Sequence, residues 1–266
     1  MEEKILKAVY EALGKNESLA LVTLTEVKGS TPRDAGSIMA VYSDGSILGS
    51  IGGGPMEYEV IKEALDAINK GESKEFNHAL TPQGEFKAQC GGYAKGYIKV
   101  FKAKNKLIIA GGGHIGRKLL ELGKFLGFYC ILVDDRENYK SEKSLQIADE
   151  IVICNYSNIN DFVKIDENSY IVVITQNCYC DFDCVKNILD KNFKYLGIIG
   201  SKSKQKFIKD NLKDNGFNDV LIDKIYGPIG LDISNQLPEE IAFSILSEIL
   251  LIKNNGNLKH KKTKWN

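Results

Sequence analysis

The stretch from Leu107 to Asp135 constrains the fold more than any other part of the sequence. It reads LIIAGGGHIGRKLLELGKFLGFYCILVDD, an apolar strand, a glycine-rich turn, a helix and a second apolar strand that ends in two aspartates. Gly111, Gly113 and Gly116 have the G-x-G-x-x-G spacing of turns that bring the backbone close to a phosphate. The free amides at the start of the following helix would then face the anion. The stretch predicts a nucleotide-type phosphate site, and the alternative is that the glycines serve close packing only.

Three further apolar runs continue this pattern, with helical stretches among them. They are residues 150–154, 170–175 and 195–199. Apolar strands with crossover helices are typical of a parallel sheet that is buried on both faces. Pro238 opens a last helix, because proline suits the first turn and Glu239 and Glu240 complement the helix dipole. The sequence therefore predicts a Rossmann-like, doubly wound α/β domain over residues 105–254, followed by a polar, basic tail at 255–266.

The preceding part of the chain, residues 1–104, has a different pattern. β-Branched runs and a hairpin signal at Asp44-Gly45 alternate with two segments of helical spacing. The expected strands are residues 19–27, 37–42, 46–51 and 97–101, and the expected helices are residues 2–13 and 56–69. These elements predict a small α+β domain, with the polar segment 102–106 as the boundary. We expect the ligand to lie in the cleft between the two domains.

The charge balance and the cysteines limit the class of partner and the compartment. Lys plus Arg and Asp plus Glu both number 35, so no net charge favours nucleic acid or membrane as a partner. No apolar run approaches the roughly 20 residues that a membrane span requires. The six cysteines follow an amino-terminal segment without the apolar region of a signal peptide. These features predict a cytoplasmic protein with reduced thiols.

Five segments, in order along the chain, resemble the XdhC/CoxI family. They are residues 29–60, which begin GSTPRDAG and contain SIGGG, then 90–100, 111–116, 195–204 and 227–249. The resemblance implies a chaperone that binds molybdenum cofactor and promotes its sulfuration together with a cysteine desulfurase. It implies delivery of the cofactor to the apo-enzyme of xanthine dehydrogenase or a related molybdenum hydroxylase. We expect the chaperone to be a homodimer.

Under this resemblance, the amino-terminal half contributes cofactor-binding residues. They are Ser30, Pro32, Arg33, Gly52, Gly53, Gly54 and Glu57. Arg33 suits a phosphate or an oxyanion, and the three glycine amides suit a second anion cradle. Cys90 precedes two glycines, and its thiolate is the expected molybdenum ligand and sulfur-handling group. Each of these residues has an alternative role. Arg33 can be an ordinary surface arginine, and the three glycines can form the exit of a hairpin. Glu57 can complement the helix dipole, and Cys90 can be a buried thiol.

In the carboxyl-terminal half, the expected cofactor-binding residues surround the glycine turn. They are Gly111, Gly113, His114, Gly116, Asp134, Ser201 and Lys202. Asp134 stands where an acidic group can accept a ribose hydroxyl. His114 can equally cap or pack, and the lysines after Gly200 can equally form a solvated basic face.

The segment TQNCYCD, residues 175–181, departs from the family pattern T-R-G-H-x-x-D. Gln176 and Cys178 stand where arginine and histidine are usual, and Asp181 keeps its place. Cys178 and Asp181 join Cys90 as expected catalytic residues. Three cysteines occur here, at 178, 180 and 184, but their spacing lacks the two pairs of a structural zinc site. Core or unpaired thiols are the alternative.

Two other functions remain open at the level of sequence. The glycine turn also suits NAD(P) or another nucleotide. The protein could therefore be an NAD(P)-dependent oxidoreductase or a nucleotide-sensing regulatory module. His78, His114 and His260 are the only histidines in the sequence, which leaves few candidates for a histidine proton relay.

Overall fold

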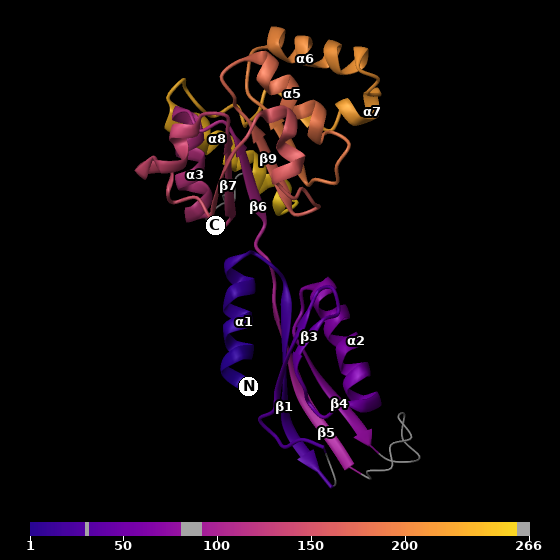
Figure 1. The fold of residues 1–266 in the computed structure, drawn as a ribbon. Coiled ribbons are helices and arrows are strands. Elements are labelled where there is room, and N and C mark those ends of the chain that lie inside the picture. Colours follow the sequence, from indigo (N-terminus) through magenta and orange to yellow (C-terminus); the bar gives the residue numbers. More distant parts are fainter. Residues whose placement is uncertain (30–31, 81–91, 260–266) are drawn as a thin grey trace, which may run out of the picture. The chain divides into compact units, whose positions relative to one another are not determined.

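A computed structural model of the chain describes residues 1–29, 32–80 and 92–259 (Figure 1). The chain divides into two compact units, Met1–Ala103 and Lys104–Asn266. Within these described residues, the first unit has an antiparallel sheet and two helices, and the second has a parallel sheet with helices on both faces. The predicted fold class, a small α+β domain followed by a Rossmann-like domain, is confirmed.

The sheet of the amino-terminal unit has the strand order β3-β2-β1-β5-β4, and all its pairs are antiparallel. Its strands are β1 (Leu19–Lys28), β2 (Ile38–Tyr42), β3 (Ile47–Gly49), β4 (Lys74–Leu80) and β5 (Gly92–Phe101). Helix α1 (Glu2–Gly14) packs on one face and α2 (Gly54–Lys70) on the other. Side chains alternate along a strand. Leu19 therefore packs in the hydrophobic core between the sheet and α1, whereas Ala20 and Val22 pack in the core between the sheet and α2.

Strand β4 is a strand that the sequence pattern did not predict. In its sequence, KEFNHAL, the single apolar residue Phe76 is followed by two polar residues before the next apolar residue. Phe76 and His78 are buried on the α2 face, while Glu75 and Asn77 are exposed. The alternation is therefore present, but a buried histidine takes the place of the apolar residue that would have revealed it.

The sheet of the carboxyl-terminal unit is parallel and has the order β11-β10-β9-β6-β7-β8. Its strands are β6 (Lys106–Ala110), β7 (Tyr129–Asp134), β8 (Glu150–Ile153), β9 (Ser169–Val173), β10 (Tyr195–Ile198) and β11 (Ile225–Tyr226). Counted from β6, this is the 3-2-1-4-5-6 order of a Rossmann sheet. The two-residue strand β11 was not predicted, because so short a segment has no detectable period.

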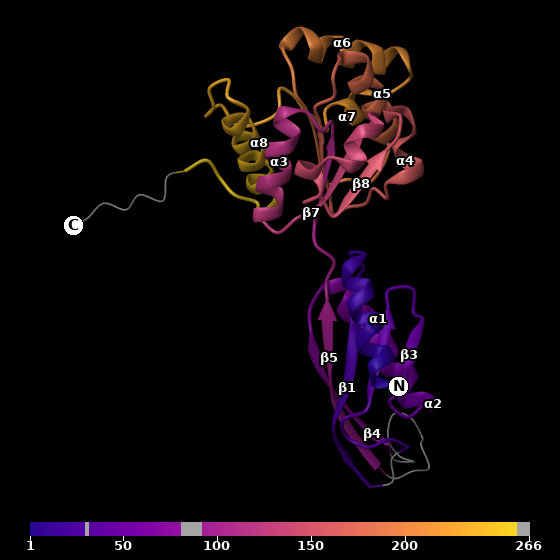
Figure 2. The same cartoon turned by 60° about the vertical axis from the view of Figure 1, so that its left-hand side comes forward.

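Helices cover both faces of this sheet, as the two views of the ribbon show (Figure 2). Helices α3 (His114–Phe125) and α8 (Pro238–Lys253) cover one face. Helices α4 (Ile159–Phe162), α5 (Cys178–Ile188), α6 (Lys202–Asp214) and α7 (Asp219–Ile222) cover the other. Strand β6 is buried on both sides, since Leu107 and Ile109 contact the first group of helices and Ile108 and Ala110 the second.

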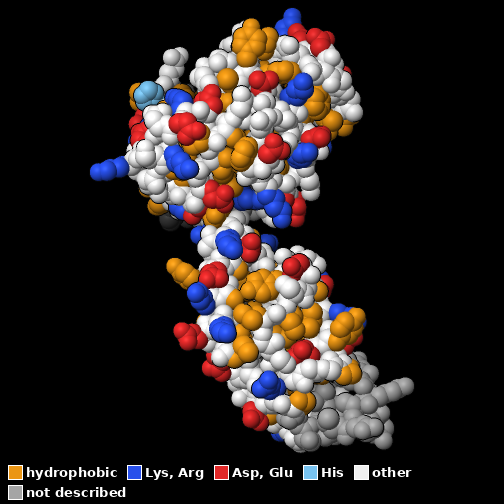
Figure 3. Space-filling model, viewed as in Figure 1, with side chains coloured by type: hydrophobic (Ala, Val, Ile, Leu, Met, Phe, Trp, Pro, Cys, Tyr) orange, Lys and Arg blue, Asp and Glu red, His pale blue; other side chains and the backbone are white. Residues whose placement is uncertain are grey.

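The surface carries charges of both signs. Figure 3 shows lysine, arginine, aspartate and glutamate interspersed over one face, with no extended region of one sign among the residues drawn in colour. Within residues 1–29, 32–80 and 92–259, no helix is long and apolar enough to cross a membrane.

Candidate functional site

The switch point of the parallel sheet lies between β6 and β9. From these neighbouring strands the chain continues in opposite directions, to β7 and β8 on one side and to β10 and β11 on the other. Backbone hydrogen bonds continue past the strand ends, from Gly111 N to Val133 O (2.8 Å) and from Ile174 N to Ala110 O (2.9 Å). Ligands of open α/β sheets bind outside the carboxyl ends of the strands at such a point.

The glycine turn, residues 111–116, leaves β6 at this edge and enters α3. Gly111 has a φ of +118°, and a Cβ on it would lie 2.4 Å from the carbonyl oxygen of Ile174. A Cβ on Gly116 would lie 2.1 Å from the carbonyl oxygen of Gly111. At Gly113, in contrast, an added Cβ would meet no atom within 4 Å. Two glycines thus serve close packing, while the space beside the Cα of half-buried Gly113 is open.

Asp134, at the end of β7, is fully buried and holds the turn. Its carboxylate accepts hydrogen bonds from Gly112 N (2.7 Å) and from the backbone and guanidinium of Arg136 (2.7–3.1 Å). Burial raises the pKa of Asp134, but the hydrogen bonds from Arg136 and Gly112 outweigh it, so the pKa lies below its ordinary value. Both oxygens are engaged within the protein. The geometry makes Asp134 a positioning residue of the turn, and its contact with a ribose hydroxyl stays a prediction.

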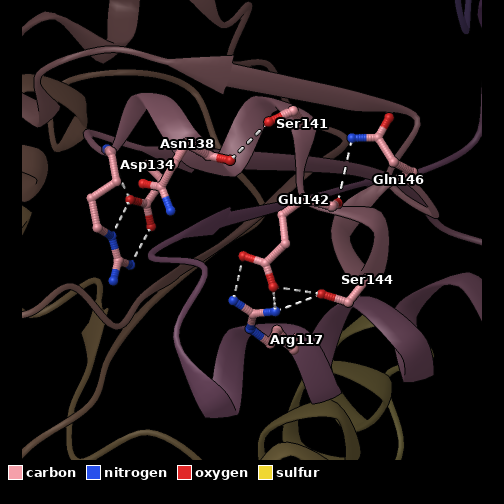
Figure 4. Close-up of polar contacts among 8 residues, drawn as sticks. Arg117, Asp134, Asn138, Ser141, Glu142, Ser144 and Gln146 are labelled. Carbon is pink, nitrogen blue, oxygen red and sulfur yellow. Dashed lines mark hydrogen bonds and ion pairs between the residues drawn. The ribbon is translucent and has the colours of Figure 1, made fainter.

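Two arginines flank Tyr139 beside the turn. The guanidinium carbon of Arg136 lies 3.9 Å from the centre of the Tyr139 ring, and that of Arg117 lies 5.3 Å from it. Arg117 pairs with Glu142 and also donates to Ser144, as Figure 4 shows beside the Asp134 cluster. The hydrogen bonds from Arg117 and Ser144 lower the pKa of Glu142 to about 2. The segment after β7 is thereby fixed to α3.

The loop after β9 brings Cys178 and Asp181 to the same edge of the sheet. Cys178 is the first residue of α5 and is half-buried, and the side chain of Asn177 caps this helix. Asp181 is fully buried, and its carboxylate accepts from the backbone amide (3.0 Å) and hydroxyl (2.6 Å) of Thr175 and pairs with Lys204 of α6. Asp181 therefore fixes the loop between β9 and α5, and Cys178, at the end of this loop, is one of two half-buried thiols, with Cys180.

A hydrogen bond links the loops that follow β7 and β9. Gln176 Nε2 donates to Asp135 Oδ2 at 2.8 Å. Since β6 lies between β7 and β9 in the sheet, this link connects the two strands on either side of the glycine turn. Gln176, one of the departures from the family pattern, thus has a partner in the same edge.

The start of α6 carries the predicted cofactor-binding residues Ser201 and Lys202. Ser201 caps the helix, with its hydroxyl 3.4 Å from Lys204 N and 2.8 Å from the hydroxyl of Ser203. Lys202 is exposed, as is His114 at the start of α3. Lys204, which was not among the predicted residues, makes the ion pair with buried Asp181. The alternation of Lys202, Lys204 and Lys206 did not reveal which lysine turns inward.

Of the other cysteines in this segment, Cys184 is a core thiol and Cys180 is half-buried. Cys184 is fully buried, and burial raises its pKa. Burial also raises the pKa of the Cys180 thiol, which lies 3.4 Å from Gln176 Nε2. No group of three or more His, Cys, Asp or Glu side chains that could hold a metal occurs within the described part of the chain.

In the amino-terminal unit, the loop before α2 holds a carboxylate of the chain itself. Glu57 Oε2 accepts from the Ser50 hydroxyl (2.6 Å) and from the amides of Ile51 (2.9 Å) and Gly53 (3.0 Å). Burial raises the pKa of Glu57, but these bonds outweigh it and the pKa lies below its ordinary value. The Gly52 amide donates to the Ser50 hydroxyl at 3.1 Å. Two of the three glycines of the predicted anion cradle thus donate within the chain, Gly53 to Glu57 and Gly52 to Ser50, and their contact with a ligand stays a prediction.

Two predicted motifs of this unit lie together. A Cβ on Gly52 would lie 3.5 Å from the ring of Pro32, so Pro32 of the first motif contacts the loop SIGGG. Arg33, beside Pro32, is exposed. Added Cβ atoms on Gly53 and Gly54 would meet nothing within 4 Å. Ser30 and Cys90 lie outside the described residues.

The strand order and the glycine turn define a Rossmann domain, here preceded by a small α+β domain. Residues 107–249 match the XdhC Rossmann domain, and residues 12–78 match the XdhC and CoxI family. The chain belongs to the XdhC/CoxI family.

Curated relatives from Escherichia coli and Bacillus subtilis match parts of the chain. Escherichia coli YqeB, described as uncharacterized, is 28% identical over 91% of this chain and 45% of its own length. A protein of Bacillus subtilis described as a probable xanthine dehydrogenase subunit is 25% identical over 58% of this chain and 44% of its own. The E. coli molybdenum cofactor insertion chaperone PaoD is 34% identical over 33% of this chain and 28% of its own. The chain thus spans less than half the length of each of these relatives.

A solved structure has the same fold. A crystal structure described as a xanthine dehydrogenase from Bacillus halodurans superposes with a TM-score of 0.52 at 19% identity. The match covers 95% of this chain and 96% of that one. At this identity the likeness concerns the fold alone.

Proposed function

We propose that this protein is a cytoplasmic accessory protein that binds molybdenum cofactor and assists its sulfuration and its insertion into a xanthine dehydrogenase-type hydroxylase. Family membership over both units supports the proposal, as does a relative named as a molybdenum cofactor insertion chaperone. The cofactor is the cargo of the protein and is not turned over by it.

The glycine turn is the observation that carries this proposal. At Gly113, which precedes a helix of 12 residues beside the switch point, an added Cβ would meet no atom within 4 Å. A phosphate of the cargo fits there, because helix amides and the helix dipole both favour an anion. Asp134 and Asp181 hold the loops on either side of the turn, so the site is preformed.

The remaining roles fall to thiols and a guanidinium. Cys178 is a half-buried thiol at the first position of α5, at this edge. We assign contacts with the metal centre and the transferred sulfur to Cys90 and Cys178, and contact with cargo oxyanions to Arg33. These assignments follow from the chemistry of soft thiolate ligands and of guanidinium forks.

Binding of isolated molybdenum cofactor under anaerobic conditions tests the proposal. The wild-type protein should bind the cofactor and protect it from oxidation, whereas Gly113→Ala should bind about tenfold more weakly. Cys90→Ala and Arg33→Ala should release the cofactor faster. A wild-type protein that neither binds nor protects the cofactor contradicts the proposal.

The proposed partners are a molybdenum hydroxylase apo-enzyme, a cysteine desulfurase and a second copy of this chain. Leu6, Tyr10 and Leu13 support the homodimer, since they form an apolar stripe along α1 and are 44–79% exposed. Light scattering should give twice the chain mass, and Tyr10→Glu should reduce it. A monomer at micromolar concentration contradicts the dimer.

An NAD(P)-dependent oxidoreductase is the second candidate. The Rossmann strand order and the G-x-G-x-x-G turn favour it. Asp134 argues against tight NAD binding, because its carboxylate is engaged by Gly112 and Arg136. Tight binding of NADH or NADPH with a substrate-dependent change in its absorbance would favour this candidate.

A further inference from the structure

The residues after β7 stack an arginine on an aromatic ring beside the glycine turn. The Arg136 guanidinium stacks on Tyr139 at 3.9 Å, and Tyr139 packs against Gly112, where an added Cβ would lie 2.9 Å from the ring. Tyr139 is 9% exposed, so its position is set by packing. The chain therefore holds one face of the guanidinium against an aromatic ring.

The edge of the same guanidinium is fixed by Asp134. Arg136 Nε and Nη2 donate to the two carboxylate oxygens at 2.7 Å each, and Gly112 N donates to one of these oxygens. The guanidinium is thus separated from the glycine turn by a single carboxylate oxygen. Its side chain is still 42% exposed, so a planar cation lies open to solvent next to the proposed phosphate site.

The charges around Arg136 disfavour a second phosphate at this position. Asp134 neutralises the guanidinium, and Asp135 and Glu137 on either side of it are both exposed. A dianion would meet three carboxylates and one cation. A neutral, planar ring meets no such repulsion, and arginine stacks well on π-systems.

We propose that Arg136 is the stacking platform for the heteroaromatic ring of the ligand whose phosphate the glycine turn holds. The ligand class is therefore a nucleotide or a pterin phosphate, recognised at its ring by stacking and at its phosphate by amides. This inference rests on the proposed phosphate site at Gly113 and adds a specificity-determining residue to it.

Calorimetric titration of the full chain with ADP, CDP and inorganic pyrophosphate tests the platform. Wild type should bind ADP and CDP more tightly than pyrophosphate. Arg136→Lys keeps the charge beside Asp134 but removes the plane, and it should weaken ADP and CDP about tenfold while leaving pyrophosphate unchanged. Arg136→Ala should do the same where it folds. Lys140→Ala, which removes an exposed charge from the same segment, should change none of the three affinities.

The outcomes separate the platform from the phosphate site. If Arg136→Lys changes none of the affinities, or weakens pyrophosphate as much as ADP, the platform is refuted while the phosphate site stands. If wild type binds the three probes equally, the ring is not recognised and the platform is again refuted. If wild type binds none of them, the phosphate site fails and the platform fails with it.

Discussion

Replacement of Asp134 by asparagine tests the claim that this carboxylate holds the glycine turn. Asparagine has the same shape, but its amide group must face one of the N–H donors that the carboxylate now accepts. The buried bond from Gly112 N to a charged acceptor contributes roughly 1.5–3 kcal/mol. The bonds from Arg136 add less, because its side chain is 42% exposed and screened by solvent. Asp134→Asn should therefore lower the free energy of unfolding by about 2 kcal/mol.

The measurement is urea unfolding followed by circular dichroism, with thermal unfolding as a second readout. A loss of about 2 kcal/mol should lower the Tm by roughly 6 °C in a unit of this size. Hydrogen exchange at residues 111–113 should accelerate in the variant. Asp135→Asn is the matched control: the same chemical change at an exposed neighbour should cost no more than about 0.5 kcal/mol.

The pH dependence gives an independent check with a definite sign. The pKa of Asp134 is lowered in the folded state, so its stabilisation is fully present above about pH 4, the ordinary aspartate pKa. The stabilisation is lost as the pH falls through the lower, folded-state pKa. The difference between wild type and Asp134→Asn should therefore shrink on acidification below pH 4. Equal stabilities at pH 7, or a difference that grows in acid, would refute the reasoning.

Three further substitutions have defined outcomes. Gly116→Ala should cost about 3 kcal/mol in thermal unfolding, because its Cβ would lie 2.1 Å from a backbone oxygen, whereas Gly113→Ala should be nearly neutral; equal losses would contradict the assigned roles. Lys204→Met should cost about 3 kcal/mol by leaving buried Asp181 without its cation, and a double-mutant cycle with Asp181→Asn should recover most of it; additive losses would exclude the pair. Glu57→Gln should cost about 1 kcal/mol at pH 7, an effect that fades in acid because the Glu57 pKa is lowered; a pH-independent loss would be inconsistent with a half-buried, ionised acceptor.

Several elements followed directly from local pattern. The helix predicted at residues 2–13 is Glu2–Gly14, and the strand predicted at 19–27 is Leu19–Lys28. The hairpin around Asp44-Gly45 forms as expected, with antiparallel pairing. Such elements are set by hydrophobic periodicity within a few residues, and this periodicity can be read directly from the sequence. The two-residue β11 and the polar β4 exist only because neighbouring strands pair with them.

The candidate site followed from sequence less completely. The spacing of Gly111, Gly113 and Gly116 predicted the turn, but it did not distinguish the two packing glycines from the open one. Arg136 follows directly after the two aspartates, yet nothing in the order of residues indicated that it would engage Asp134 and stack on a tyrosine.

The sequence by itself determined the fold class, the family and the position of the glycine turn. These depend on hydrophobic period, turn residues and motif order, all of which are local along the chain. Only the tertiary structure decided which partner each charged side chain of the site contacts. Asp134 and half-buried Glu57 accept hydrogen bonds from backbone amides, and Lys204 pairs with Asp181, since a carboxylate withdrawn from water must find donors wherever the packed chain provides them.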